Sequence, residues 1–490
     1  PELVVEGETG FAFKSGNVDD LTKTFLKASL VNEINYQSMQ QACAKYVDKR
    51  CLQDRYIKQL LDIYEAAANG ITPMGRRYRM STTYDLRHLR RIQAVFGSRP
   101  RTAKGSKDIF ITLTVAFFLL TFVLKALTDG IFVTLGQKGA ITDSKYLTMG
   151  GAIFFGICYM GRSHKFGMFW REFKQLVIVV LAFVLVTCGL VLYRGEFDSW
   201  QVRDILNLLT PMLFAYVVLN TIPFEALHKC MKVVLVSSFI GYIIQLLLRG
   251  VTWADIWASS FDNSTSALES NDFSALAIML CFYFCYYRKD MSCTILSVVF
   301  AVATFKRLAI IFAIVILVLP KIVDPNRHLP KRSGLFFKIL FFALAMGYMY
   351  LLWPTTAAVR VFGQDLDEMT MGRADFLRVL IDSGFQSFGY GSVEATLGYS
   401  LEMCFIRISL ELSPLATLLF INNYWNLTRG NFYCVLLIVF QFLNLTTADS
   451  ISAMFAWAVA YILIGSIHYR YQLANAMNID GVIYVPSRSR

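Results

Sequence analysis

Long apolar runs are the feature that most constrains the fold of this chain. Lipid offers the backbone no hydrogen-bond partners, so a crossing segment forms a helix of about 20 mostly apolar residues or joins a closed barrel. Here about twelve apolar runs recur, several of them shorter than that length, and they predict an all-α polytopic membrane protein. The runs lie near 109–127, 146–160, 175–193, 205–222, 231–248, 272–287, 292–305, 308–323, 336–353, 400–421, 431–447 and 451–467.

The composition agrees with this class and excludes others. Apolar residues make up 56% of the chain and charged residues 17%, whereas soluble domains average about 45–50% and about 25%. The net charge of +12 is carried mostly between the apolar runs, which is typical of loops facing anionic lipid and argues against nucleic acid as a partner. The ten cysteines form no CxxC or zinc spacing, so we interpret them as reduced thiols and expect no metal and no cofactor.

The first hundred residues contain no run long enough to span lipid. We interpret residues 1–70 as a small cytoplasmic α/β fragment and 71–107 as a basic linker that precedes the first span. Because the chain opens on Pro1-Glu2-Leu3, we expect it to be part of a longer protein. The predicted elements are short strands at Val4-Val5 and Phe11–Phe13, a helix beginning near Asn17, and helices near 31–48 and 52–68.

This first segment resembles the carboxyl-terminal end of retaining GT-B glycosyltransferases. The resemblance is carried by Pro1-Glu2, by the glycines Gly7 and Gly10, and by a last helix that ends in Ile63-Tyr64. In that family, the glutamates that bind the nucleotide sugar lie upstream of this point. The resemblance therefore implies a fragment that does not transfer sugar alone.

The distribution of Lys and Arg predicts the orientation of the membrane part, residues 108–467. With the amino terminus inside, one set of loops and the tail carry about 17 basic residues, and the opposite loops carry about 10. The positive-inside rule then places both termini in the cytoplasm, including the tail 468–490. The longest loop on the opposite, outer side is 354–399.

Lys306-Arg307 stands at the predicted outer end of two abutting apolar runs. Charge beside the membrane core suggests a functional site, and Arg can bind two phosphate oxygens at once. These cations are interpreted either as a grip on an anionic head group or as a cationic turn that caps two helices. Both interpretations remain open at this stage.

Glu402, Arg407 and Glu411 recur near helical spacing in an otherwise apolar run. Buried charges are tolerated when they are paired or face a polar cavity. One hypothesis is a structural network of the three side chains. The other is a carboxylate at the mouth of a cavity, where it takes a proton from a sugar hydroxyl.

Residues 109–467 are similar to the polysaccharide polymerase and O-antigen ligase (Wzy-like) superfamily of bacterial envelopes. The similarity is carried by the many spans and the large outer loop near the carboxyl end. Within that loop it is carried by Gly372-Arg373 and Gly389-Tyr390-Gly391, followed by a helix with an early glutamate. At the position where ligases and many polymerases of the family have a His-Asn pair, this chain has Glu402-Met403.

The resemblance implies an inner-membrane polymerase that moves a glycan from undecaprenyl pyrophosphate to the hydroxyl of a lipid-linked repeat unit. Glu402 is the first candidate for the catalytic base and Asp375 the second, with Arg407 and Glu411 in support. A chain-length regulator protein and membrane lipids are further expected partners. The residues implied in binding the pyrophosphate are Arg373, Arg307, Lys306 and Arg360.

Three alternatives remain beside the polymerase. A flippase or other transporter of the lipid-linked sugar would use the same cations without a base, and an O-antigen ligase is disfavoured by the missing His. A polyprenyl-phosphate-sugar glycosyltransferase needs acidic residues in its first outer loop, where Asp129 and Asp143 lie far apart in the sequence. Asp365–Glu368 is interpreted as a solvated acidic turn rather than as a cation site.

Overall fold

In the computed structural model the chain forms two compact units, Pro1–Arg90 and Arg91–Arg490. It describes residues 10–11, 18–31, 33–50, 108–137, 139–252, 254–255, 266–288, 290–352, 373–448 and 451–479.

The first unit contains two described helices, α1 (Val18–Ser29) and α2 (Glu33–Arg50). Asp19 and Asp20 lie in the first turn of α1 and Lys27 in its last turn, which matches the helix dipole at both ends. These helices agree with the two predicted near residue 17 and at 31–48. The strands at Val4-Val5 and Phe11–Phe13, the helix at 52–68 and the linker 71–107 lie wholly or mainly outside the described residues.

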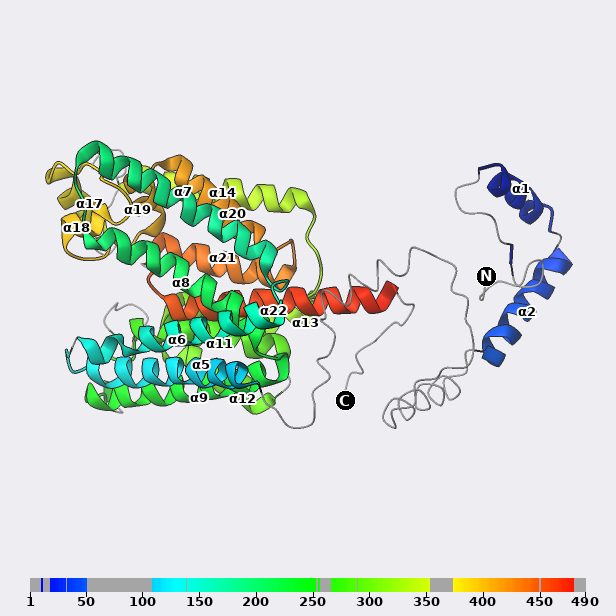
Figure 1. Cartoon of the computed structure of the whole chain (residues 1–490), viewed down its shortest axis with the longest axis horizontal. Coiled ribbons are helices and arrows are strands. Elements are labelled where there is room, and N and C mark those ends of the chain that lie inside the picture. Colours follow the sequence, from blue (N-terminus) through cyan, green and yellow to red (C-terminus); the bar gives the residue numbers. More distant parts are fainter. Residues whose placement is uncertain are drawn as a thin grey trace. The chain divides into compact units, whose positions relative to one another are not determined.

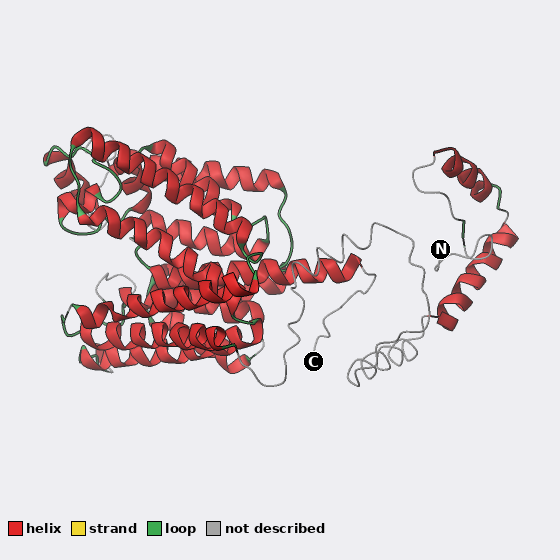
Figure 2. Ribbon diagram, viewed as in Figure 1, coloured by secondary structure: helices red, strands yellow, loops and turns green. Residues whose placement is uncertain are grey.

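The described part of the second unit is built of helices and loops, which confirms an all-α fold there (Figure 2). The helices are α5 (Ile109–Leu127), the π-helix η1 (Thr128–Val133), α6 (Ala140–Ser163), α7 (Trp170–Arg194), α8 (Ser199–Thr221), α9 (Phe224–Leu248), α11 (Asn271–Tyr287), α12 (Met291–Ala303), α13 (Arg307–Ile322), α14 (Lys331–Leu352), α17 (Arg373–Asp382), α18 (Ser392–Leu397), α19 (Cys404–Glu411), α20 (Pro414–Asn426), α21 (Phe432–Thr447) and α22 (Met454–Ile479).

Five helical segments of the described residues are long and apolar enough to cross a membrane. Their outward faces carry large apolar side chains, such as Leu185 and Leu192 of α7, which are 71% and 86% exposed. A single exposed leucine is ordinary, but whole apolar faces on long helices require lipid around them. The chain is therefore a membrane-embedded protein. The five segments are Ile109–Val133, Trp170–Arg194, Ser199–Thr221, Phe224–Leu248 and Lys331–Leu352.

Helices α11 and α22 form the centre of the second unit. Nearly every side chain of α11 is buried, and α22 is buried continuously from Met454 to His468. Helix α22 packs against α8, α11 and α21, and in Figure 1 it lies between α7, α14, α20 and α21 on one side and α5, α6, α9 and α12 on the other. A helix that is apolar on all sides is surrounded either by lipid or by protein, and the packing of α22 shows that protein surrounds it here.

Two glycines allow the first span to cross α9 at close range. A Cβ atom built on Gly130 of η1 would lie 2.5 Å from the carbonyl oxygen of Gly241, and one on Gly241 would lie 2.5 Å from the carbonyl oxygen of Ala126. Small residues at such crossings let helix backbones approach closely in membranes. Both of these carbonyl oxygens are backbone atoms, so they can make room for a Cβ only if the two helices move apart.

Replacing Gly241 with alanine is therefore expected to destabilise the protein by about 1–3 kcal/mol, the usual effect of overpacking. The matched control is Gly189→Ala in α7, where a Cβ would meet no atom within 4 Å. That change is expected to be neutral or to stabilise by up to about 1 kcal/mol, since alanine favours the helix. Denaturant unfolding of the two purified variants measures the difference, and equal stabilities would contradict the close crossing.

The structure differs from the sequence prediction at two of the apolar runs. The run at 400–421 is divided into α19 and α20 at Leu412-Ser413, because Pro414 disfavours helix at the residue before it and Ser413 caps the N–H of Ala416. Helix α6 begins at Ala140, six residues before the predicted run 146–160. The apolar pattern missed its first turns because they contain polar residues such as Lys145, whose charge is paired inside the protein.

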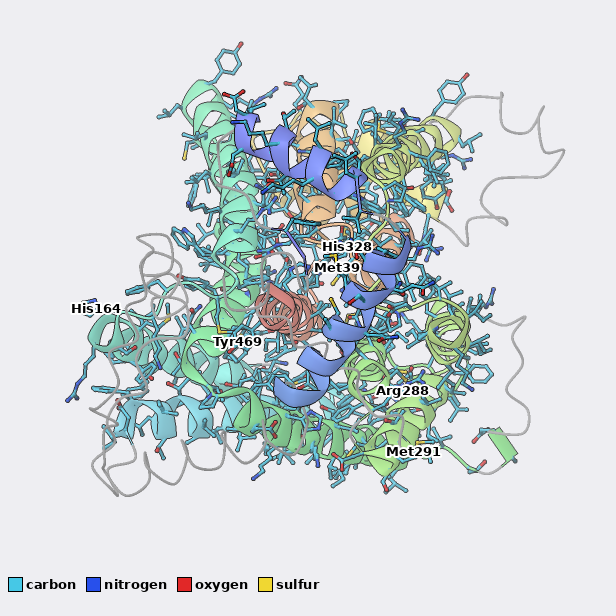
Figure 3. The ribbon with its side chains drawn as sticks, turned by 90° about the vertical axis from the view of Figure 1, so that its right-hand side faces the viewer. Met39, His164, Arg288, Met291, His328 and Tyr469 are labelled. Carbon is cyan, nitrogen blue, oxygen red and sulfur yellow. The ribbon has the colours of Figure 1, made fainter. Side chains whose placement is uncertain are left out.

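The loops that the Lys and Arg distribution predicts to be cytoplasmic lie at one end of the second unit. His164 follows α6, Arg288 follows α11, and His328 lies between α13 and α14. All three are labelled on the end that Figure 3 faces. Helices α17 and α18 lie at the opposite end (Figure 1).

Candidate functional site

Three short helices, α17, α18 and α19, follow α14 and precede α20 at one end of the membrane unit (Figure 1). Their buried faces form a small apolar core of their own, which includes Leu377, Val393 and Met403. This core also takes in Leu352 at the end of α14. The segment α17–α19 is thus a packed structure rather than a loose loop, and it holds most of the residues singled out in the sequence.

Arg373 and Glu402 come together in this segment. The guanidinium Nη2 of Arg373, the first residue of α17, donates a hydrogen bond of 3.1 Å to Oε2 of Glu402, just before α19. The two side chains are 22% and 49% exposed. The sequence analysis predicted Arg373 as a cation that binds pyrophosphate and Glu402 as the base for a hydroxyl. In the structure these two side chains are in contact at a partly open surface.

The other predicted site residues lie in different surroundings. Asp375 pairs with Arg378 on the same face of α17, at 3.2 Å and largely exposed. Lys306 is the N-cap of α13, and its ammonium lies 3.9 Å from Glu269. Arg307 is exposed at the first position of α13, and Arg360 lies outside the described residues.

Arg407 is the centre of a buried ion network. Its Nη1 donates to Oε1 of Glu394, its Nη2 donates to the Tyr390 hydroxyl at 2.9 Å, and its Nη2 lies 3.4 Å from Oδ2 of Asp204. The Nε atom lies 3.8 Å from Oε2 of Glu411. The guanidinium and all three carboxylates are at least 96% buried, so the network is closed to bulk water.

This network differs from the one predicted from helical spacing. Arg407 and Glu411 belong to it, whereas Glu402 pairs with Arg373 instead, because Leu401–Met403 precede the helix and do not share its face. Asp204 and Glu394 were missed. Asp204 lies one residue before the run at 205–222, where a charge beside an apolar core was a usable signal. Glu394 lies in the predicted outer loop 354–399, where no neighbouring sequence pattern indicates that it is buried.

The sequence Gly389-Tyr390-Gly391 explains how this network forms. Both glycines have positive φ, 124° and 98°. A Cβ would lie 2.5 Å from Cγ2 of Thr187 at the first and 2.9 Å from the backbone nitrogen of Gln201 at the second. Only glycine allows this conformation and this approach to α7 and α8. The turn thereby brings Tyr390 against the guanidinium of Arg407.

A second buried charge cluster lies where α5 continues into the π-helix. Lys125 and Lys145 both pair with the carboxylate of Asp129, and Lys125 also donates to the carbonyl oxygen of Asp272 at 2.9 Å. All three charged side chains are at most 9% exposed. Asp129 therefore serves two internal lysines, and Asp143 lies exposed on α6. The presence of Lys125 within the apolar run 109–127 could have indicated this cluster, because a charge inside a span needs a buried partner.

Among groups outside the spans, Asp290 in the turn between α11 and α12 has the clearest electrostatic partner. Its carboxylate accepts from Lys232 at 2.5 Å and lies 3.5 Å from Nε2 of His228. The hydrogen bond from Lys232 lowers the pKa of Asp290 below its ordinary value. This exposed pair ties the α11–α12 turn to α9 and is a structural contact.

No protein-family model, no curated protein and no solved structure matches this chain. Within the part of the chain that the structure describes, no three His, Cys, Asp or Glu side chains are arranged to hold a metal ion.

Proposed function

We propose that this chain is a glycosyltransferase of the bacterial inner membrane, of the polysaccharide polymerase type. It would transfer a glycan from undecaprenyl pyrophosphate to a hydroxyl of a lipid-linked repeat unit. The contact between Arg373 and Glu402 at a partly open surface is the observation that carries this proposal. It combines a cation suited to phosphate with a carboxylate suited to a hydroxyl proton.

The reaction assigns one task to each of these side chains. The bond between the anomeric carbon and the pyrophosphate oxygen breaks, and the acceptor hydroxyl forms the new glycosidic bond. Glu402 takes the hydroxyl proton, while Arg373 stabilises the negative charge that develops on the leaving pyrophosphate. In the free protein Arg373 is held by Glu402, so the substrate's phosphate would have to compete with that carboxylate for the guanidinium.

The proposed topology has twelve crossings, with both termini in the cytoplasm. In this scheme α19 and α20 together make one broken crossing, and α17 and α18 lie on the outer side. The support is the excess of Lys and Arg on the loops that gather at the end seen in Figure 3. The Arg373–Glu402 pair would then face the side where lipid-linked repeat units are joined.

The test is a transfer assay on the full chain, reconstituted in lipid with a synthetic undecaprenyl-pyrophosphate repeat unit. A ladder of products is expected from the unmodified protein. Arg373→Met is expected to lower the rate by about 10²–10³-fold, the usual effect of removing one donor to a developing anion. The matched control is Arg378→Met, because Arg378 lies on the same helix, is 44% exposed and pairs with Asp375.

Three outcomes would each contradict a part of the proposal. Unchanged substrate with folded, reconstituted protein would contradict the transfer activity itself. A rate for Arg373→Met equal to that of Arg378→Met would contradict the role of the cation. Undiminished product from Glu402→Gln would reject Glu402 as the base and leave Asp375 as the next candidate.

A transporter of the same lipid-linked sugar is the second candidate. The observation that favours it is the pair of buried charge clusters around Arg407 and Asp129, since buried ionisable groups within spans also mark proton and substrate pathways. Movement of a fluorescent lipid-linked sugar across vesicles without any product ladder would select this candidate over the polymerase.

A further inference from the structure

The carboxyl groups around Arg407 outnumber its charge. Three carboxyls, from Asp204, Glu394 and Glu411, surround one guanidinium. If all three were ionised, one positive charge would face three negative charges, which leaves two negative charges unbalanced. Each side chain is at least 96% buried, and isolated charge in such surroundings is relieved by binding a proton or a cation.

Two of the carboxyl oxygens have no hydrogen-bond donor. Oδ2 of Asp204 and Oε2 of Glu411 are buried and accept no hydrogen bond from any described residue. Two other oxygens have donors. Oε1 of Glu411 accepts from the N–H of Val393 at 2.9 Å. Oε1 of Glu394 accepts from Ser400 at 2.6 Å as well as from Arg407. A buried carboxylate oxygen without a donor is costly, and a proton bound there turns it into a donor itself.

Asp204 and Glu394 contact the same guanidinium. Oδ2 of Asp204 lies 3.4 Å from Nη2 of Arg407, and Oε1 of Glu394 accepts a hydrogen bond from Nη1. Two carboxylates repel and cannot hydrogen bond, whereas a protonated carboxyl donates readily to a carboxylate. A proton bound by either group removes the repulsion between these two carboxyls, which come from α8 and α18.

Among the described residues that face the cluster, no second compensating cation is found. The groups that face the cluster are Asp204 from α8, Tyr390 from the turn before α18, Glu394 from α18, and Cys404, Arg407 and Glu411 from α19. Arg407 is the single cation among these described residues, and the described residues contain no metal-binding arrangement. Tyr390 adds a hydroxyl but no charge.

We propose that Asp204, Glu394, Glu411 and Arg407 form a proton-binding site that holds at least one proton at neutral pH. The bound proton relieves the repulsion among carboxyls from α8, α18 and α19 and so stabilises the packing of the segment α17–α19 against α8. The proton belongs to the cluster rather than to a single residue, because the three carboxyls interact strongly. This inference is independent of the proposed transfer activity.

Infrared spectroscopy of the full chain in lipid nanodiscs tests the proposal without any substrate. A protonated carboxyl has a carbonyl band that a carboxylate lacks. We expect this band in the unmodified protein at pH 7 and its loss or shift in Asp204→Asn and in Glu394→Gln. The matched control is Asp382→Asn, an exposed carboxyl at the end of α17, which should leave the band unchanged.

A second measurement follows stability against pH. The folded protein keeps a proton that a carboxyl of the unfolded chain releases near pH 4, so stability falls as the pH rises from about 4 until the cluster itself loses the proton. Each bound proton changes the folding equilibrium by about tenfold per pH unit in this window. The Asp204→Asn variant should lose this dependence, and the Asp382→Asn control should keep it.

The proposal is overturned if the unmodified protein has no protonated carboxyl band at pH 7. It is also overturned if the band is identical in the folded Asp204→Asn, Glu394→Gln and Glu411→Gln variants. Should none of the three variants fold, the spectrum and the pH dependence of the unmodified protein decide alone. A failure here leaves the transfer assay untouched, and a failed transfer assay leaves the proton site untouched.

Discussion

Replacing Arg407 with methionine is expected to destabilise the protein by about 3–5 kcal/mol, the usual effect of removing one partner from a buried ion pair. The change leaves Asp204, Glu394 and Glu411 buried without their only described cation. It also removes the hydrogen bond to the Tyr390 hydroxyl. Methionine fills a similar volume, so a cavity adds little to the effect.

Unfolding of the purified variant in detergent, followed by denaturant, measures this loss. The control is Arg378→Met, whose exposed pair with Asp375 should contribute less than about 1 kcal/mol. If the two variants were equally stable, the Arg407 network would not be the contact that holds α17–α19 to α8. The stability of Arg407→Lys should lie between the stabilities of Arg407→Met and Arg378→Met, since lysine keeps the charge but lacks the planar fork of arginine.

Replacing Asp129 with asparagine is expected to have a similarly large effect, about 3–5 kcal/mol. Lys125 and Lys145 share this single carboxylate inside the protein, so the change leaves two buried ammonium groups without an anion. Lys125 retains the carbonyl oxygen of Asp272 as an acceptor. A carbonyl oxygen does not balance a full charge, and the lysines respond by losing protons.

Two variants sharpen the interpretation of this result. Lys145→Met removes one of the two lysines and leaves a balanced Lys125–Asp129 pair, so its loss should be much smaller than that of Asp129→Asn. Asp143→Asn changes an exposed carboxylate in the first turn of α6 and should cost about 0.3–1 kcal/mol through the helix dipole. The same unfolding measurement ranks all three, and a Lys145→Met loss as large as that of Asp129→Asn would contradict the charge imbalance.

The candidate site was only partly predictable. Arg373 and Glu402 were singled out separately, and their contact depends on how α17 turns back toward α19, which no local pattern encodes. The network of Arg407 with Glu411 was predicted from their spacing of four residues, since that spacing shares a helix face. Glu402 was wrongly placed in it, because the apolar run was taken as one helix whereas the described helix begins at Cys404.

By itself the sequence determined that this chain is a helical membrane protein. The reason is local, because a segment in lipid must satisfy its own backbone, and apolar runs such as 175–193 record that requirement residue by residue. Only the tertiary structure decided which charges meet, as in Arg407 with Asp204 and Lys145 with Asp129. Those pairs join different helices, and the balance of buried charge is a property of the packed bundle rather than of any single segment.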